Sequence, residues 1–227
     1  MSQAKDATST RSETRRFPPV RNYLLALLVI VALLAVIVAA PFAATHDRFP
    51  GDLALLEAIQ RIPGFEPVAR FFNVPVHDWL ISFFAVCMVV LLALRREQAA
   101  AIAFVTVWLG PYVNRAAKAL VDRPRPEGDF AIFYAPDSPA FPSAHAFSAA
   151  LFATLLALAA FRLLPPGAAR AVLAFSIVFT LVAGTARPWL GVHWPSDVLA
   201  GWLLGVAVAG AAWLVTHVLA RPRQQLR

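Results

Sequence analysis

The sequence predicts an all-α polytopic membrane protein with six transmembrane helices in a bundle. Of its 227 residues, 59% are hydrophobic and only 15% are charged, and the mean hydropathy is +0.66. This composition is too apolar for an ordinary soluble domain, and the length suits one membrane domain. The apolar residues also gather in six runs of about 17 to 25 residues, each able to cross a hydrocarbon core about 30 Å thick.

The six runs are expected to be helices, because backbone groups facing lipid must be hydrogen-bonded within their own segment. They are Tyr23–Ala44, Trp79–Leu94, Ala99–Leu120, Ser143–Leu163, Ala168–Ala186 and Pro195–Leu219. The first run is longer than the apolar core of a signal peptide, so we expect a retained anchor and not a cleaved leader. The membrane domain is therefore expected to span residues 23–219. Residues 1–22 are predicted to form a disordered cytoplasmic tail and residues 220–227 a second cytoplasmic tail.

The net charge of +7 does not indicate a nucleic-acid partner, because the basic residues lie mostly at the ends of the apolar runs. Twelve of the 20 Lys and Arg residues fall in residues 1–22, 95–98, 162–170 and 221–227. The positive-inside rule then places both termini in the cytoplasm. The single cysteine, Cys87, lies inside an apolar run and offers neither a disulfide framework nor a zinc cluster.

Three connections are then expected to face outward: 45–78, 121–142 and 187–194. The first contains "GDLALLEAIQRIPG", in which apolar and polar positions alternate at helical spacing. We expect a short amphipathic helix at the membrane surface. Its solvated face is predicted to hold Glu57 and Arg61, followed by Glu66 and Arg70.

Polar residues concentrate at this outward face. They are Lys118, Arg123, Arg125, Ser143, His145, Arg187, His193 and Asp197. Arg123 alone is equally consistent with an interfacial anchor. The group as a whole indicates a site, because anchoring does not require two histidines or a histidine followed four residues later by an aspartate.

The chemistry of this group suits a phosphate. Lys118, Arg125 and Arg187 supply hydrogen-bond donors and positive charge, and arginine matches phosphate oxygens in a planar fork. "PSAH" begins a helix, whose free amides and positive dipole end favour an oxyanion there.

The two histidines are expected to divide the reaction. One helical turn brings Asp197 under His193, where it fixes the imidazole tautomer and makes the ring a nucleophile toward phosphorus. His145, on another helix, is placed to protonate the leaving oxygen and then to activate water. Two histidines also permit a metal site, but the nearby acids, Asp122, Glu127, Asp129 and Asp137, form no ligand constellation. We therefore expect no metal and no other cofactor.

These residues carry a resemblance to the type 2 phosphatidic acid phosphatase family, membrane phosphatases related to vanadium haloperoxidases. Its first motif, lysine, six residues, then Arg-Pro, is matched by "KALVDRPRP", which selects Arg125 over Arg123. Pro-Ser-Gly-His is matched by "PSAH", with Ala144 in place of glycine. "ARPWLGVHWPSD" matches the third motif through Arg187, His193 and Asp197, with Ala186 in place of serine.

The resemblance implies that Lys118, Arg125, Ser143, Ala144 (through its amide) and Arg187 hold the substrate phosphate. It implies a phosphohistidine on His193, with Asp197 orienting it and His145 as acid and base. Metal is not needed in this family. The relation to haloperoxidases makes a vanadate cofactor a remote option, because those relatives are soluble and this chain is not. The implied substrates are undecaprenyl diphosphate, phosphatidic acid, phosphatidylglycerophosphate and related lipid phosphates, with the first favoured by an outward site.

Other functions remain open from the residues alone. Transfer of a lipid phosphate to an acceptor alcohol would use the same side chains. A transporter would carry polar residues near the membrane midplane, where this sequence is nearly uncharged. The expected partners are the bilayer and a lipid phosphate, in a bacterial inner membrane with the site facing the periplasm or exterior. The sequence does not indicate an oligomeric state.

Overall fold

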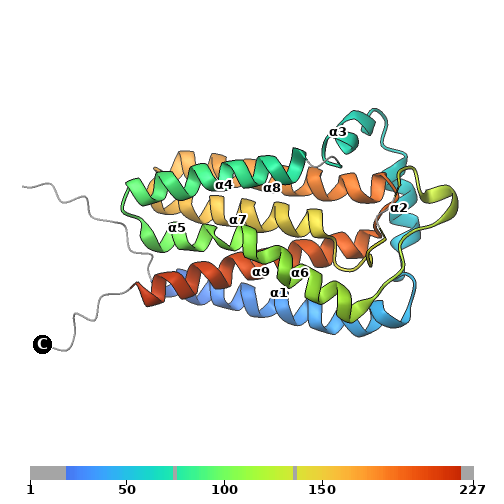
Figure 1. Ribbon diagram of the computed structural model, residues 1–227, viewed down its shortest axis with the longest axis horizontal. Coiled ribbons are helices and arrows are strands. Elements are labelled where there is room, and N and C mark those ends of the chain that lie inside the picture. The colour runs from blue at the N-terminus through green and yellow to red at the C-terminus, as the bar shows by residue number, and fades with distance from the viewer. Residues whose placement is uncertain (1–18, 74–75, 135–136, 221–227) are drawn as a thin grey trace, which may run out of the picture.

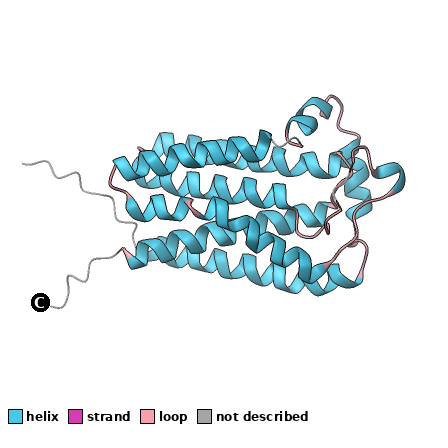
Figure 2. Ribbon diagram, in the orientation of Figure 1, coloured by secondary structure: helices cyan, strands magenta, loops and turns pink. Residues whose placement is uncertain are grey.

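The computed structural model describes residues 19–73, 76–134 and 137–220, and these residues form helices joined by loops (Figure 2). The elements are α1 (Pro19–Thr45), α2 (Asp52–Gln60), α3 (Glu66–Phe71), α4 (Val76–Leu94), α5 (Gln98–Phe104), α6 (Thr106–Val121), the 3₁₀ helix η1 (Gly128–Phe130), α7 (Ala144–Leu163), α8 (Pro166–Trp189) and α9 (Pro195–Leu219). Within the described ranges there is no strand, so the all-α prediction is confirmed.

The long helices form a bundle around α7, which contacts α8 on one side and α9 on another, while α1 packs against α9 (Figure 1). We call the end of the bundle that holds α2 and α3 the α2 end. The connections 121–143 and 190–194 also lie there. We call the opposite end, where α1 begins and α9 ends, the terminal end. The three connections predicted to share one face are therefore together at the α2 end.

Four helices are long and apolar enough to cross a membrane by length and composition: Val20–Thr45, Ala144–Leu163, Pro166–Trp189 and Pro195–Leu219. A shorter apolar helix covers Asp78–Leu94. The third predicted run, Ala99–Leu120, is divided between α5 and α6 and is not one continuous helix. The count of six crossings therefore stays a prediction.

The division between α5 and α6 lies at Val105 and has a local cause. The amides of Val105 and Trp108 bond to carbonyls three residues earlier, a tighter turn than the α-helical one. The Thr106 hydroxyl donates to the carbonyl of Ala103 across 2.6 Å and so competes for a helical acceptor. Pro111 adds a second irregularity, since it has no amide for the preceding turn.

The first helix begins slightly before the predicted start of the membrane domain. Helix α1 begins at Pro19, four residues before the expected start at Tyr23. The rest of the tail predicted over residues 1–22 lies outside the described residues, as does the tail predicted over 220–227 apart from Ala220.

Two glycines allow α9 to lie close against α7. A Cβ added at Gly201 would stand 2.5 Å from the carbonyl oxygen of Ser143, and one at Gly205 would stand 2.5 Å from the carbonyl oxygen of Phe147. Atoms cannot approach so closely, so larger residues would push the two helices apart. The glycines therefore set the spacing between the starts of α7 and α9.

The predicted amphipathic helix is present as α2, and it packs on the α2 end of the bundle against α8 and α9. Leu56 is fully buried and Ile59 packs on a small apolar cluster that includes Trp189 and Val192. Glu57 and Arg61 form an exposed ion pair at the end of α2, as predicted. Glu66 and Arg70 are also exposed and paired, but they lie on the separate helix α3 and not on α2. Helix α2 thus covers the loops that carry the candidate site.

Candidate active site

The structure brings the three sequence motifs together at the α2 end, from five segments of the chain. Lys118 lies in the last turn of α6 and Arg125 in the connection that follows it. Ser143 caps α7, Ala144 and His145 are its first two residues, and Arg187 lies near the end of α8. His193 precedes α9, and Asp197 lies in the first turn of that helix.

A backbone hydrogen bond joins the beginnings of the two central helices. The amide of Ser143 donates to the carbonyl of Asp197 across 2.9 Å. Because Gly201 permits this approach, the segment that begins α7 lies directly beside the segment that carries the predicted nucleophile. Two motifs more than forty residues apart in the sequence therefore share one local framework.

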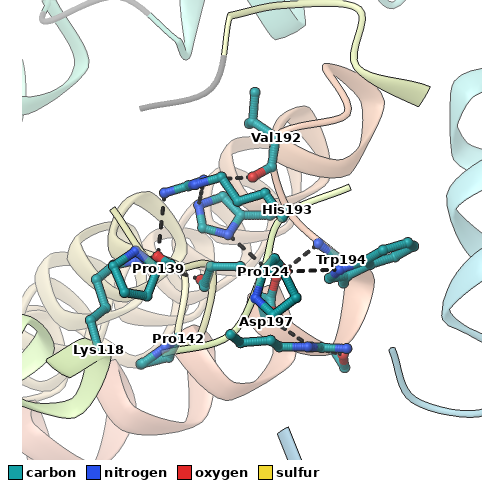
Figure 3. Close-up of polar contacts among 12 residues, drawn as sticks. Lys118, Pro124, Pro139, Pro142, Val192, His193, Trp194 and Asp197 are labelled. Atoms are coloured by element: carbon teal, nitrogen blue, oxygen red, sulfur yellow. Dashed lines mark hydrogen bonds and ion pairs between the residues drawn. The ribbon is translucent and has the colours of Figure 1, made fainter. Parts of the chain in front are cut away.

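His193 lies between an acidic and a basic partner, and its side chain is almost fully buried (Figure 3). Its Nδ1 faces Oδ2 of Asp197 at 3.5 Å. Its Nε2 lies 3.0 Å from Nη1 of Arg125. A guanidinium only donates hydrogen bonds, so Nε2 is the acceptor and the proton of the neutral ring is on Nδ1. The lone pair of Nε2 thus points toward the cationic side of the site.

The surroundings of His193 keep its ring neutral. Burial lowers the pKa of His193 well below the ordinary value of 6.5, because the imidazolium loses its hydration. The charges of Arg125, Lys118, Arg187 and His145 lower this pKa further, in that order. A neutral imidazole, whose Nε2 carries a lone pair and no proton, is the form that a nucleophile needs.

Lys118 and Arg125 both donate to the backbone of residues 138–140, and Figure 3 shows Lys118 beside Pro139. The ammonium of Lys118 donates to the carbonyl of Pro139 and, at 3.3 Å, to that of Ala140. Arg125 donates to the carbonyl of Ser138 at 2.8 Å and to that of Val192 at 2.5 Å. Both cations are therefore held beside His193 by carbonyl oxygens.

Apart from Nδ1 of His193, which faces Asp197 at 3.5 Å without a hydrogen bond, two buried donors at the site have no hydrogen-bond partner among the described residues. They are the hydroxyl of Ser143 and Nε of Arg187. Ser143 is fully buried and Arg187 is 2% exposed, although Nη1 of Arg187 donates to the side-chain carbonyl of Asn73. An unpaired buried donor is costly, and an oxyanion would satisfy both groups.

The start of α7 adds the amides and dipole of a helix N-terminus to this cationic group. Ser143 makes no side-chain cap, so its hydroxyl is not used by the helix. Among described non-glycine residues, only Arg96 and Asp122 have positive φ. Ala144 therefore has a negative φ, which alanine adopts without strain, and its amide remains available at the helix start.

His145 is half-buried, unlike the enclosed His193, and its charge acts on His193. Position 186, where the family motif has serine, does not take part in the polar group. Ala186 is fully buried in the apolar cluster with Trp189, Leu190 and Val192. Its methyl group therefore serves packing.

Sequence reasoning missed three polar residues that support the site. Asp52 is buried at the start of α2 and pairs with Arg123. Asn73 binds Arg187, and Asn114 donates to the carbonyl of Pro142 at 3.4 Å. The first two come from a connection that lies far from the motifs in sequence, so no spacing signal pointed to them. The Asn114 side chain is one helical turn before Lys118, a spacing that was available.

Two further features concern the surroundings of the site. Among the described residues, no group of three or more His, Cys, Asp or Glu side chains is arranged to hold a metal ion. Beside the site lies a cavity of about 730 Å³ that Arg125 and Trp194 help to line, together with the chain from Thr45 to Arg48. Of the predicted phosphate-binding residues, Arg125 alone lines this cavity.

Comparison with known proteins agrees with the fold and the motifs. Residues 99–221, more than half of the chain, match the sequence model of the PAP2 superfamily. A comparison with curated proteins gave no match. The structure is similar to the crystal structure of the first transmembrane PAP2 type phosphatidylglycerolphosphate phosphatase from Bacillus subtilis, with a TM-score of 0.63 and 20% sequence identity. The similarity covers 90% of this chain and 100% of that one, and it concerns the fold. The chain is therefore an integral membrane protein that belongs to the PAP2 superfamily.

Proposed function

We propose that the protein is a membrane lipid phosphatase that works through a phosphohistidine on His193 and without a metal ion. One observation carries this proposal: Nε2 of His193 accepts a hydrogen bond from Arg125 and lies in the field of Lys118 and Arg187, while Nδ1 faces Asp197. A neutral nucleophile directed at a cationic pocket suits attack on an anionic phosphorus centre.

The reaction is expected to have two steps. His193 Nε2 attacks phosphorus, the bond from phosphorus to the leaving oxygen breaks, and His145 gives that oxygen a proton. Water then attacks phosphorus and gives a proton to His145, the P–N bond breaks, and inorganic phosphate leaves. Lys118, Arg125, Arg187, Ser143 and the Ala144 amide hold the phosphoryl oxygens. Asp197 stabilises the positive charge that develops on the ring of His193.

The proposed substrate is a lipid phosphate or diphosphate. The site lies at one end of a bundle of apolar helices. The head group of a lipid can therefore reach the site while its hydrocarbon tail stays in the bilayer. Undecaprenyl diphosphate, phosphatidic acid and phosphatidylglycerophosphate are the candidates, and an outward-facing site in a bacterial inner membrane favours the first. The orientation proposed from the basic residues places both termini in the cytoplasm.

The test is phosphate release from purified protein in detergent, with a chelator present. The three lipids are the substrates of the panel. The His193→Ala and His145→Ala variants are assayed beside the wild-type protein. We expect release from at least one lipid and its loss in the His193 variant. Release from none, or release that His193→Ala leaves unchanged, would overturn the proposal. A requirement for added divalent metal would overturn the metal-free assignment.

The covalent intermediate is tested with p-nitrophenyl phosphate, whose leaving group departs without a proton. His145→Gln is then expected to form the phosphoenzyme but to break it down slowly, because only the second step needs the base. Mass spectrometry after an alkaline quench should find the added phosphate on His193. Phosphate on no residue, or on another residue, would contradict this route. Adding an acceptor alcohol distinguishes hydrolysis from phosphotransfer by the product.

A further inference from the structure

Arg123, the Arg-Pro arginine that the motif spacing sets aside, is completely enclosed and uses its donors away from the phosphate pocket. Its side chain is 0% exposed. Nη1 donates to Oδ1 of Asp197 at 2.5 Å and to the Ser196 hydroxyl at 2.8 Å. Nη2 donates to Oδ2 of Asp52 at 2.9 Å, and Nε to the carbonyl of Asp47 at 3.2 Å. Because each of its three nitrogens already has a partner, Arg123 is not positioned to bind the substrate phosphate.

Asp52 binds Arg123 from the side opposite Asp197 and links the start of α2 to the start of α9. Its Oδ2 accepts from Arg123, from the Ser196 hydroxyl at 2.6 Å and from the Phe49 amide at 2.8 Å. Its Oδ1 accepts from the Ser196 amide at 2.9 Å. The carboxylate thus connects α2 to the first turn of α9, the turn that carries Asp197.

Asp197 has no freedom to turn within this arrangement. Arg123 holds its Oδ1, while its Oδ2 accepts from the Trp194 amide at 2.8 Å and faces Nδ1 of His193. The carboxylate of Asp197 is fully buried. These contacts fix the orientation of both carboxylate oxygens. Which oxygen of Asp197 faces the imidazole therefore depends on Arg123.

We infer that Asp52 and Arg123 are positioning residues that hold Asp197, and through it the Nδ1–H tautomer of His193. The inference rests on the proposed function for its catalytic consequence. Neither residue touches the phosphate pocket through a described contact. Asp52 lies outside the residues 99–221 that match the superfamily model, so the first connection of this chain supplies part of the nucleophile's support.

A purely structural ion pair would also be damaged by substitution, so the test needs a matched control. Glu97 and Arg162 form such a pair: their atoms lie 2.6 Å apart, and their side chains are 10% and 16% exposed. The pair lies at the terminal end, away from His193. Glu97→Gln is therefore expected to lower stability without changing turnover per folded molecule.

The experiment measures kcat and KM for Asp52→Asn and Glu97→Gln with the most active lipid phosphate of the panel. Asp52→Asn is expected to lower kcat about tenfold, the scale of lost support behind a functional histidine, with little change in KM. Equal kcat in Asp52→Asn and wild type, or equal losses in Asp52→Asn and Glu97→Gln, would overturn the inference.

A second readout does not depend on turnover. Long-range ¹H–¹⁵N spectra of histidine-labelled protein in micelles report the tautomer of His193, assigned by loss of its signal in His193→Gln. Wild type is expected to show a proton on Nδ1, and Asp52→Asn a mixture of tautomers. An unchanged tautomer would overturn the inference. If wild type releases no phosphate, the proposed function fails while this readout still tests the positioning role.

Should Asp52→Asn not fold, Arg123→Lys takes its place, because it keeps a buried positive charge between the two carboxylates. Lysine cannot reproduce the arginine fork. We expect a shifted tautomer and a lower kcat. Wild-type values for both in the folded Arg123→Lys protein would overturn the inference.

Discussion

Arg125 donates a hydrogen bond to Nε2 of His193 across 3.0 Å, so the guanidinium occupies the nitrogen that attacks phosphorus in the proposed mechanism. An incoming phosphate therefore has to draw Arg125 away from the ring. Phosphate oxygens are better acceptors for arginine than a neutral imidazole, because both partners are then charged. Substrate binding and exposure of the nucleophile are thus the same event in this arrangement.

The pH dependence of kcat/KM is expected to show activity that persists into mildly acidic solution. Neutral His193 is the reactive form, and its pKa lies well below 6.5. Protonation, and with it the loss of rate, therefore begins only below that pH. kcat/KM measured from about pH 4.5 to 9 reports the free enzyme and free substrate. An acid limb centred above pH 6.5 that does not follow the titration of the substrate would contradict the assignment.

Arg125→Gln is expected to move this acid limb to higher pH. Removing the nearest positive charge raises the pKa of His193 toward its ordinary value. kcat/KM near neutral pH should also fall about tenfold to a hundredfold, since a charge-assisted hydrogen bond contributes roughly 1.5–3 kcal/mol. Substrate titration is common to both proteins and does not affect the difference. Arg70→Gln, at an exposed arginine paired with Glu66, is the control and should behave as wild type.

Substitutions at Ala144 test whether the backbone there approaches the phosphate. Ala144→Gly keeps the amide and should retain activity, with at most about 1 kcal/mol lost from the helix. Ala144→Val places two further carbons at the start of α7 and should reduce the rate by crowding the phosphate. Initial rates of phosphate release for the three proteins check this order. Full activity in the valine variant would refute the close approach.

The spacing between α7 and α9 is expected to control both stability and activity. Gly201→Ala places a Cβ 2.5 Å from the carbonyl of Ser143. Overpacking of this kind costs typically 1–3 kcal/mol, and it should separate Ser143 from Asp197. Gly167→Ala is the matched control, because no atom lies within 4 Å of the added carbon. Thermal unfolding in detergent and phosphate release measure the two effects. Equal melting temperatures for the two variants would contradict this explanation.

Hydrophobic run length predicted most of the fold, because a membrane helix must satisfy its own backbone. Five of the six runs correspond to single helices, with ends shifted by a few residues. The division at Val105 was not predicted, since it depends on a threonine hydroxyl and on turns three residues long. These contacts do not alter the apolar composition of the run.

The site was predictable where motifs fix the order of residues and not where contacts join distant segments. Spacing placed His193 and Asp197 one turn apart, as the structure has them. It did not connect Asp52 with Arg123, which lie 71 positions apart. The sequence left Arg123 equally consistent with an interfacial anchor, and the structure shows instead a buried link between two carboxylates.

The carbonyls of residues 138–140 have a consequence for the end of the catalytic cycle. They already bind Lys118 and Arg125, so these cations have intramolecular acceptors to return to when the product leaves. In the proposed reaction, inorganic phosphate would compete with these backbone carbonyls for the same donors. Such competition would weaken product inhibition and also lower the affinity for substrate.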